Sequence, residues 1–405
     1  MSLCSPPSLR PGALALGLSL LAATATAGPR EQALTIHSRI AGVPPSTQVL
    51  TQMSDLIEAG NTAQAVRIAM DNDGFYRATL QTWITPWTNR EMTAFAPLND
   101  YTATVMGLIR DEADFRDVLV ADVLYTGADS LGLPPYSSSN NEHYQALQQS
   151  SAPLGSSLVR RTQSQISEVP AHATAGVITS RAAAKAFFVA GTNRAMFRFT
   201  LLNHLCRDLE QVHDVTRTPD RIRQDVSRSP GGDSRVFLNN CVGCHAGMDP
   251  MAQAFAYYDY EYNAATDPDA ENGAIHYNTD GDIDPASGNR TEAKYHINAS
   301  TFAPGYVTPN NQWQNYWREG PNAILAWDPT LEGSGTGAKS LGRELANSGA
   351  FASCQVEKVF TQVCLRKPGN AADRALVSDA TAAFAASGYN LKQVFIDTAN
   401  YCKGE

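Results

Sequence analysis

Two cysteines and a histidine lie close together in the segment Cys241-Val-Gly-Cys244-His245. On one turn of helix, this spacing presents two thiols along the same side and an imidazole directly after them. C-x-x-C-H is the attachment motif of c-type haem, in which both thiols bond to the haem vinyl groups and the histidine binds the iron. We therefore expect one covalently bound haem c at Cys241 and Cys244, with His245 as an axial iron ligand.

Other chemistries of a cysteine pair fit this sequence less well. A structural zinc site needs a second pair of ligands at suitable spacing, and Cys354 and Cys364, with nine residues between them, do not supply one. A thioredoxin-like active site follows a strand in a βαβ unit, whereas the surroundings here are predicted to be helix and loop. A disulfide between Cys241 and Cys244, or a chance match, remains as an alternative.

The sequence leaves the second axial ligand of the iron open. Small cytochromes c take a distal Met from well downstream of the cysteine pair, but no Met follows Met251. The candidates are Met196 and His204 upstream, which lie eight residues apart on one predicted helix, and His276 and His296 downstream. For each of these four side chains, an ordinary core or surface role is the simpler interpretation.

Residues 1–27 are predicted to be an export signal. Arg10 precedes a short apolar run of Ala, Leu and Gly, and Ala25-Thr-Ala27 provides the small residues that a signal peptidase recognises. The apolar run is shorter than the roughly 20 residues that a membrane helix needs, and no later stretch approaches that length. We expect an exported protein, periplasmic or extracellular, with no membrane span.

Four further cysteines follow this predicted signal, and they are Cys206, Cys354, Cys364 and Cys402. An even number of cysteines in an oxidising compartment predicts two disulfides. Three pairings are possible, and the sequence does not choose among them.

The elements that must position the haem motif are predicted to be mainly α-helical. Apolar residues recur at helical spacing in an N-terminal helical region (28–174), around and before the motif in a haem c-binding module (175–312), and in a C-terminal helical module (313–405). Segments 214–234 and 262–312 are rich in polar residues, Gly and Pro, which indicates loops and short strands. The predicted fold is thus a multi-helix protein with a loop-rich, cytochrome c-like haem module.

Several helices have specific expected limits. The pattern predicts helices over 46–59 and 61–70, and another whose N-cap is Asn99 or Asp100. A helical stretch is expected over 180–212. Near the C-terminus one helix is expected over 341–363, followed by helices over 376–386 and 390–401 with Gly388 as the break.

The chain is acidic, with a formal net charge of −9, or about −10 after loss of the predicted signal. This charge argues against nucleic acid or anionic lipid as a partner. An acidic surface suits docking to a basic redox partner protein, although solubility alone is the simpler explanation.

The residues around the motif resemble a known family. Residues 241–250 (CVGCHAGMDP), with Phe255 and Asp259 after them, resemble a segment of the uncharacterised haem-binding modules in large secreted, planctomycete-type c-type cytochrome proteins. Similarity also appears at 201–206, at 282–288, at 341–354 and at 384–391, so it extends over roughly 175–405. This chain is much shorter than those proteins and has VCLR at 363–366 where they usually have ALGR.

The resemblance implies a haem-binding, mainly helical, exported protein and no particular reaction. The first hypothesis for the function is electron transfer through a single haem. The alternative is a haem-dependent periplasmic oxidoreductase acting on an unknown substrate, and a third is a binding protein in which haem stabilises the fold. The sequence does not decide whether the protein is an enzyme.

Overall fold

The computed structural model of the chain describes residues 27–188, 193–219, 221, 234–279, 282–283, 290–291 and 310–404. All but the last residue of the predicted export signal, and the distal-ligand candidate His296, lie outside these residues. Helices dominate the described chain, so the mainly α prediction is confirmed. The strands form four small antiparallel pairs. They are β1 (Leu124–Gly127) with β2 (Leu158–Arg161), β3 (Tyr258–Glu261) with β4 (Ala274–Tyr277), β5 (Asp282–Ile283) with β6 (Arg290–Thr291), and β7 (Gln312–Gln314) with β8 (Ser334–Thr336).

The described chain begins with three helices that contact one another, α1 (Pro29–Ala41), α2 (Thr47–Glu58) and α3 (Thr62–Met70). The hydroxyl of Ser46 accepts a hydrogen bond from the backbone N–H of Val49 and so caps α2. These limits agree with the two helices predicted over 46–59 and 61–70.

The middle of the chain is built around α5 (Asp100–Arg110), most of whose residues are buried. The side chain of Asn99 accepts a hydrogen bond from the backbone N–H of Thr102, so Asn99 is the N-cap. Of the shorter helices nearby in the chain, α4 (Gln81–Ile84), η2 (Thr85–Thr88) and α6 (Asp117–Val120) contact α5. The others are η1 (Phe75–Leu80), η3 (Asp129–Leu131), α7 (Glu142–Gln149), α8 (Leu154–Ser157) and α9 (Gln163–Ile166).

The helical stretch predicted over 180–212 contains two helices, α10 (Arg181–Phe187) and α11 (Asn193–Leu205). Ser180 caps the first of them. Helix α11 ends before the predicted limit because Cys206 has a φ of 53°, a left-handed conformation that an α-helix does not continue. Residues 209–212 form turns beyond it.

The single helix predicted over 341–363 is wrong. The structure has α15 (Gly337–Ala346) and α16 (Gly349–Cys364) instead. The apolar spacing runs through the break, but Ser348 has an extended backbone and its hydroxyl accepts from the N–H of Phe351, which starts a new helix. The predicted break at Gly388 is confirmed, with φ of 72°, between α17 (Ala371–Ala386) and α18 (Leu391–Cys402).

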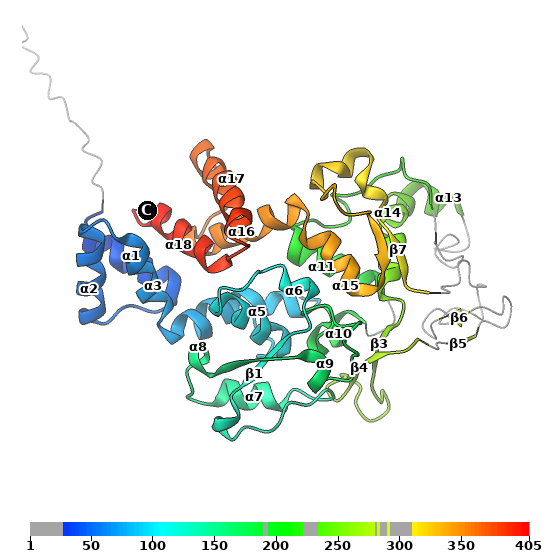
Figure 1. The fold of residues 1–405 in the computed structure, drawn as a ribbon, viewed down its shortest axis with the longest axis horizontal. Coiled ribbons are helices and arrows are strands. Elements are labelled where there is room, and N and C mark those ends of the chain that lie inside the picture. The colour runs from blue at the N-terminus through cyan, green and yellow to red at the C-terminus, as the bar shows by residue number, and fades with distance from the viewer. Residues whose placement is uncertain are drawn as a thin grey trace, which may run out of the picture.

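The two ends of the described chain share one hydrophobic core. Helix α18 contacts α1 and α3, and α16 also contacts α1. Figure 1 shows α1 to α3 beside α18 at one end of the molecule, while the segment that carries the haem motif lies near the other end. The division at 174 and 312 stays a prediction, since buried residues from all three predicted parts belong to this core.

Two disulfides form, as the cysteine count predicted. Cys206 at the end of α11 is bonded to Cys354 in α16, and Cys364 at the end of α16 is bonded to Cys402 at the end of α18. Both disulfides therefore anchor α16: the first links it to α11 in the middle of the chain, and the second links it to α18, the C-terminal helix.

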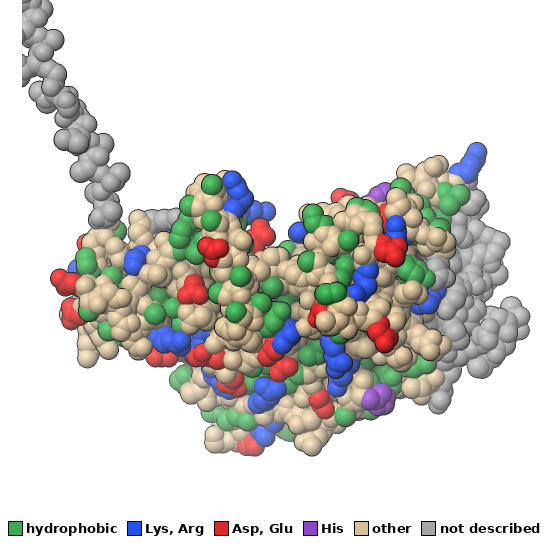
Figure 2. Space-filling view, turned by 45° about the horizontal axis from the view of Figure 1, so that its top comes forward, with side chains coloured by type: hydrophobic (Ala, Val, Ile, Leu, Met, Phe, Trp, Pro, Cys, Tyr) green, Lys and Arg blue, Asp and Glu red, His purple; other side chains and the backbone are tan. Residues whose placement is uncertain are grey.

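The described helices include none that is both long and apolar enough to cross a bilayer. On the face shown in Figure 2, acidic and basic side chains are interspersed rather than gathered into separate patches. The negative net charge is thus not concentrated in a single region of that face.

Candidate haem-attachment site

The haem motif lies on a continuous run of helix. α13 (Ser234–Val236) leads into the π-helical turn η4 (Phe237–Cys241), and α14 (Val242–Ala252) follows directly. Cys241 is the last residue of η4, while Cys244 and His245 lie in the first turn of α14. A π-helical turn is rare and frequently marks a functional site. The described residues that lead into the motif are helical, which disfavours the thioredoxin-like alternative.

The two cysteines of the motif are free thiols, both partly exposed. The four other cysteines of the described chain are paired in disulfides. Burial raises the pKa of the Cys244 thiol, and negative charge at Cys241, Glu210 and Asp208 raises it further. The Cys244 thiol lies 3.5 Å from the backbone oxygen of Leu209, to which it donates a hydrogen bond.

The imidazole of His245 is held through one of its two nitrogens. Nδ1 lies 3.1 Å from both carboxylate oxygens of Asp249, one turn later on α14. An ionised carboxylate only accepts hydrogen bonds, so Nδ1 carries the proton and Nε2 presents its lone pair. Among the described residues, Nε2 has no hydrogen-bond partner, and it is the nitrogen that a metal would use.

Asp249 is itself held by an arginine from another helix. Arg194 of α11 donates from Nε and Nη2 to the two oxygens of Asp249 at 2.8 and 2.9 Å, a bidentate pair. The Asp249 side chain is 2% exposed. Burial by itself raises the pKa of this carboxyl group, but Arg194 and His245 lower it more, and the net shift is downward. Asp249 therefore stays ionised at neutral pH.

An apolar cluster separate from the main core lies beside the motif. Phe237, Val242 and Ala246 are buried together, and Cys241 packs against them. The ring of Phe237 lies 5.9 Å from the imidazole of His245, centroid to centroid. Apolar surface therefore adjoins Cys241 and the imidazole of His245.

Two aromatic rings lie against α14 where the helix has glycine. A Cβ atom on Gly243 would lie 2.2 Å from Nε2 of His213, and one on Gly247 would lie 1.8 Å from Nε1 of Trp317. The absence of side chains at these two positions lets the rings approach the helix backbone. His213 is exposed and Trp317 is buried, so they cover the helix from the surface and from the core respectively.

The donor set fits haem c. The porphyrin supplies four nitrogens to the iron, so the protein needs only thiols for the vinyl groups and one axial nitrogen. Cys241, Cys244 and Nε2 of His245 would supply those groups. Within the part of the chain that is described, no group of three or more His, Cys, Asp and Glu side chains is arranged to hold a bare metal ion.

His204, one of the distal-ligand candidates, lies in the protein core. Its Nε2 is 2.9 Å from the hydroxyl of Tyr101, and its ring packs edge-on against Trp87 and stacked on Phe351. Burial holds the pKa of His204 well below the usual 6.5, and the nearby Lys358 lowers it further. These contacts agree with the simpler interpretation of His204 as a core residue.

The other described candidates also have neighbours that account for them. Met196 is 1% exposed and belongs to the main hydrophobic core. His276 lies on β4, where its Nδ1 is 3.0 Å from a carboxylate oxygen of Glu261 on the paired strand. His296 lies outside the described residues. The identity of a distal ligand thus stays a prediction with these four candidates.

The depressed pKa of His204 predicts a dependence of stability on pH. The unfolded chain binds a proton below pH 6.5 that the folded state does not, so the free energy of unfolding should fall as pH decreases. The slope from this residue approaches about 1.4 kcal/mol per pH unit. Urea unfolding of the wild type and of His204→Gln between pH 7.5 and 5.5 tests this. The stability difference between them should shift in favour of the variant as the pH falls, and a constant difference would contradict it.

Two residues of the site were not identified from the sequence. Asp249 could have been found, because residues four apart on a helix face each other and a carboxylate commonly holds the second nitrogen of a ligating histidine. Arg194 carries no such signal, because it is 55 residues away and reaches Asp249 only through the packing of α11 against α14.

Comparisons of the chain with protein-family models, with curated proteins and with solved structures find no match. The resemblance to the secreted haem modules therefore depends on the residues of the motif and of the C-terminal segments alone.

Proposed function

We propose that this protein is a c-type cytochrome that carries one covalently attached haem and transfers electrons. The observation that carries the proposal is the state of the cysteines: Cys241 and Cys244 are free, while the four others are paired. Neighbouring thiols in an oxidising compartment tend to form a disulfide unless another bond uses them. Thioether bonds to haem would use both.

The residues of the chain divide the work at this site. Cys241 and Cys244 would hold the haem edge, and Nε2 of His245 would bind the iron. Asp249 keeps the proton on Nδ1 and so keeps Nε2 available. Phe237 gives the imidazole an apolar neighbour on one side. When bound, the haem supplies a one-electron couple between ferric and ferrous iron.

The proposal includes an exported location and a redox partner. The two disulfides support an oxidising compartment such as the periplasm or the exterior of the cell. A partly exposed motif, in a chain with a formal charge of −9, supports a protein partner with a basic docking face. No nucleic acid is expected as a partner.

The test is the absorption spectrum of the purified chain, expressed in a host that matures c-type cytochromes. We expect a reduced spectrum of low-spin c-type haem and a pyridine haemochrome typical of two thioether bonds. A preparation without haem would overturn the proposal.

A second candidate function is a haem-dependent oxidoreductase with an open iron coordination position. It is favoured by two of the described distal candidates, since the side chains of His204 and Met196 are buried in the protein core. Carbon monoxide separates the two candidates: rapid binding to the reduced protein supports the oxidoreductase, and resistance supports electron transfer.

A further inference from the structure

A partly buried chain of charged and polar groups, with a buried carboxylate at its centre, connects α11 to the motif histidine. Arg194 donates two hydrogen bonds to Asp249, and Asp249 lies 3.1 Å from Nδ1 of His245. The exposed fractions of these side chains are 17%, 2% and 18%. The three groups come from two helices that pack together, so their order is set by the tertiary structure.

In this arrangement the negative carboxylate of Asp249 lies next to the imidazole of His245, and the positive guanidinium of Arg194 lies beyond the carboxylate. A carboxylate that accepts the Nδ1–H bond increases the electron density on the ring, which makes the other nitrogen a stronger donor. A guanidinium bonded to the same carboxylate withdraws part of that negative charge. Because the carboxylate is almost fully shielded from water, these effects are stronger than they would be at the surface.

We propose that Asp249 and Arg194 act as a pair that sets the reduction potential of the iron bound to His245, with Asp249 lowering it and Arg194 raising it. The inference rests on the proposed haem at Cys241, Cys244 and His245. A more electron-rich imidazole stabilises ferric over ferrous iron, so the carboxylate favours the oxidised state. Both residues are positioning residues, since they act through His245.

The test uses the full haem-loaded chain and measures the midpoint potential by spectroelectrochemical titration. Asp249→Asn keeps an oxygen that accepts from Nδ1 but removes the negative charge, so we expect a higher potential than in the wild type. Arg194→Gln removes the positive charge and leaves Asp249 to act on His245 alone, so we expect a lower potential. Arg194→Lys keeps the charge and should restore most of the wild-type value.

A matched control comes from another buried pair. Arg318 and Glu344 form the same bidentate contact, with exposed fractions of 21% and 2%, but the hydrogen bonds of Glu344 go to Arg318 and Asn315. Glu344→Gln should shift the potential less than Asp249→Asn. Thermal unfolding of each variant separates a loss of folding from a change of potential.

Shifts of the midpoint potential in opposite directions in Asp249→Asn and Arg194→Gln support the inference. If the two residues had a purely structural role, the direction of the shift would not depend on the sign of the charge removed. Shifts in the same direction, or shifts no larger than in Glu344→Gln, overturn it. If Asp249→Asn does not fold, the sign in Arg194→Gln and its restoration in Arg194→Lys decide. Failure of the proposed function has a different signature, because the wild type itself would then contain no covalent haem.

Discussion

Replacement of Cys241 and Cys244 by serine is expected to abolish covalent haem attachment completely. A serine hydroxyl is close in size to the thiol but does not add to the haem vinyl groups, so no thioether bond forms. The two side chains are partly exposed and do not belong to the main core. The variant should therefore fold and lose only the cofactor. Haem staining of denatured protein and the pyridine haemochrome spectrum measure the result.

Two further variants give this experiment its controls. Cys364→Ser with Cys402→Ser removes the same number of sulfur atoms at a site far from the motif, and it should keep the haem. His245→Ala should keep the thioether bonds but lose the low-spin spectrum, since the bond from Nε2 is removed. Covalent haem in the Cys241→Ser, Cys244→Ser protein would show that the attachment site was assigned wrongly. An unchanged spectrum in His245→Ala would show the same for the ligand.

Removal of the disulfide between Cys206 and Cys354 is expected to lower the free energy of unfolding more than removal of the other disulfide. The bridge closes a loop of 148 residues, and restriction of the unfolded chain gives an upper value of about 5 kcal/mol. The second bridge, Cys364 to Cys402, spans 38 residues, for which the same relation gives about 4 kcal/mol. Measured losses on removing a native disulfide are typically about 2–5 kcal/mol.

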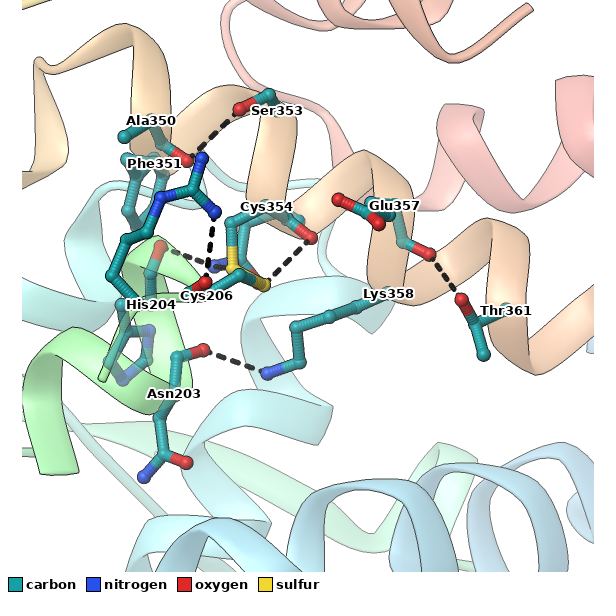
Figure 3. Close-up of a disulfide and its surroundings, with 12 residues drawn as sticks. Asn203, His204, Cys206, Ala350, Phe351, Ser353, Cys354, Glu357, Lys358 and Thr361 are labelled. Carbon is teal, nitrogen blue, oxygen red and sulfur yellow. Dashed lines mark hydrogen bonds between the residues drawn. A yellow bond between two sulfur atoms is a disulfide. The ribbon is translucent and has the colours of Figure 1, made fainter. Parts of the chain in front are cut away.

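The surroundings of the first bridge reinforce its contribution. Figure 3 shows the end of α11 linked to α16 by the disulfide and by a hydrogen bond from Nζ of Lys358 to the carbonyl oxygen of Asn203, 2.7 Å long. A second hydrogen bond, from Nε2 of Gln355 to the carbonyl oxygen of His204, is 3.0 Å long. Breaking the covalent link leaves these bonds and the packing between the two helices to hold them together. A local loosening at this junction should accompany the global loss of stability.

The measurement is urea unfolding of the double variant Cys206→Ala with Cys354→Ala, compared with the wild type. The double variant Cys364→Ala with Cys402→Ala is the matched comparison. We expect both double variants to be less stable, and the 206–354 variant to lose more. An unchanged midpoint, or a larger loss in the 364–402 variant, would contradict the prediction. Hydrogen exchange in α11 and α16 would locate the loosening.

The features that the sequence alone predicted are those governed by neighbouring residues. The spacing of Cys241, Cys244 and His245 lies within about one helical turn, so it predicts haem attachment from neighbouring residues alone. Helix starts at Ser46 and Asn99 and the break at Gly388 follow from caps and from a residue that tolerates positive φ. The number of disulfides follows from counting cysteines.

Apolar spacing was a weaker guide where a helix is interrupted. The pattern over 341–363 continues through the break at Ser348, because both α15 and α16 turn an apolar side toward the same core. The spacing of apolar residues along the sequence indicates which side chains are buried. It does not report a change of helix direction, which here depends on a hydroxyl cap.

The tertiary structure alone decided the contacts between distant residues. It chose one of three disulfide pairings, it placed His204 against Tyr101 in the core, and it brought Arg194 to Asp249 behind His245. Each of these contacts joins segments separated by 38 to 148 residues. Local periodicity carries no information about such pairs, because they form only when whole helices pack. The motif therefore predicts an attached haem, while the packing of α11 against α14 determines the charged groups behind His245, its proposed ligand.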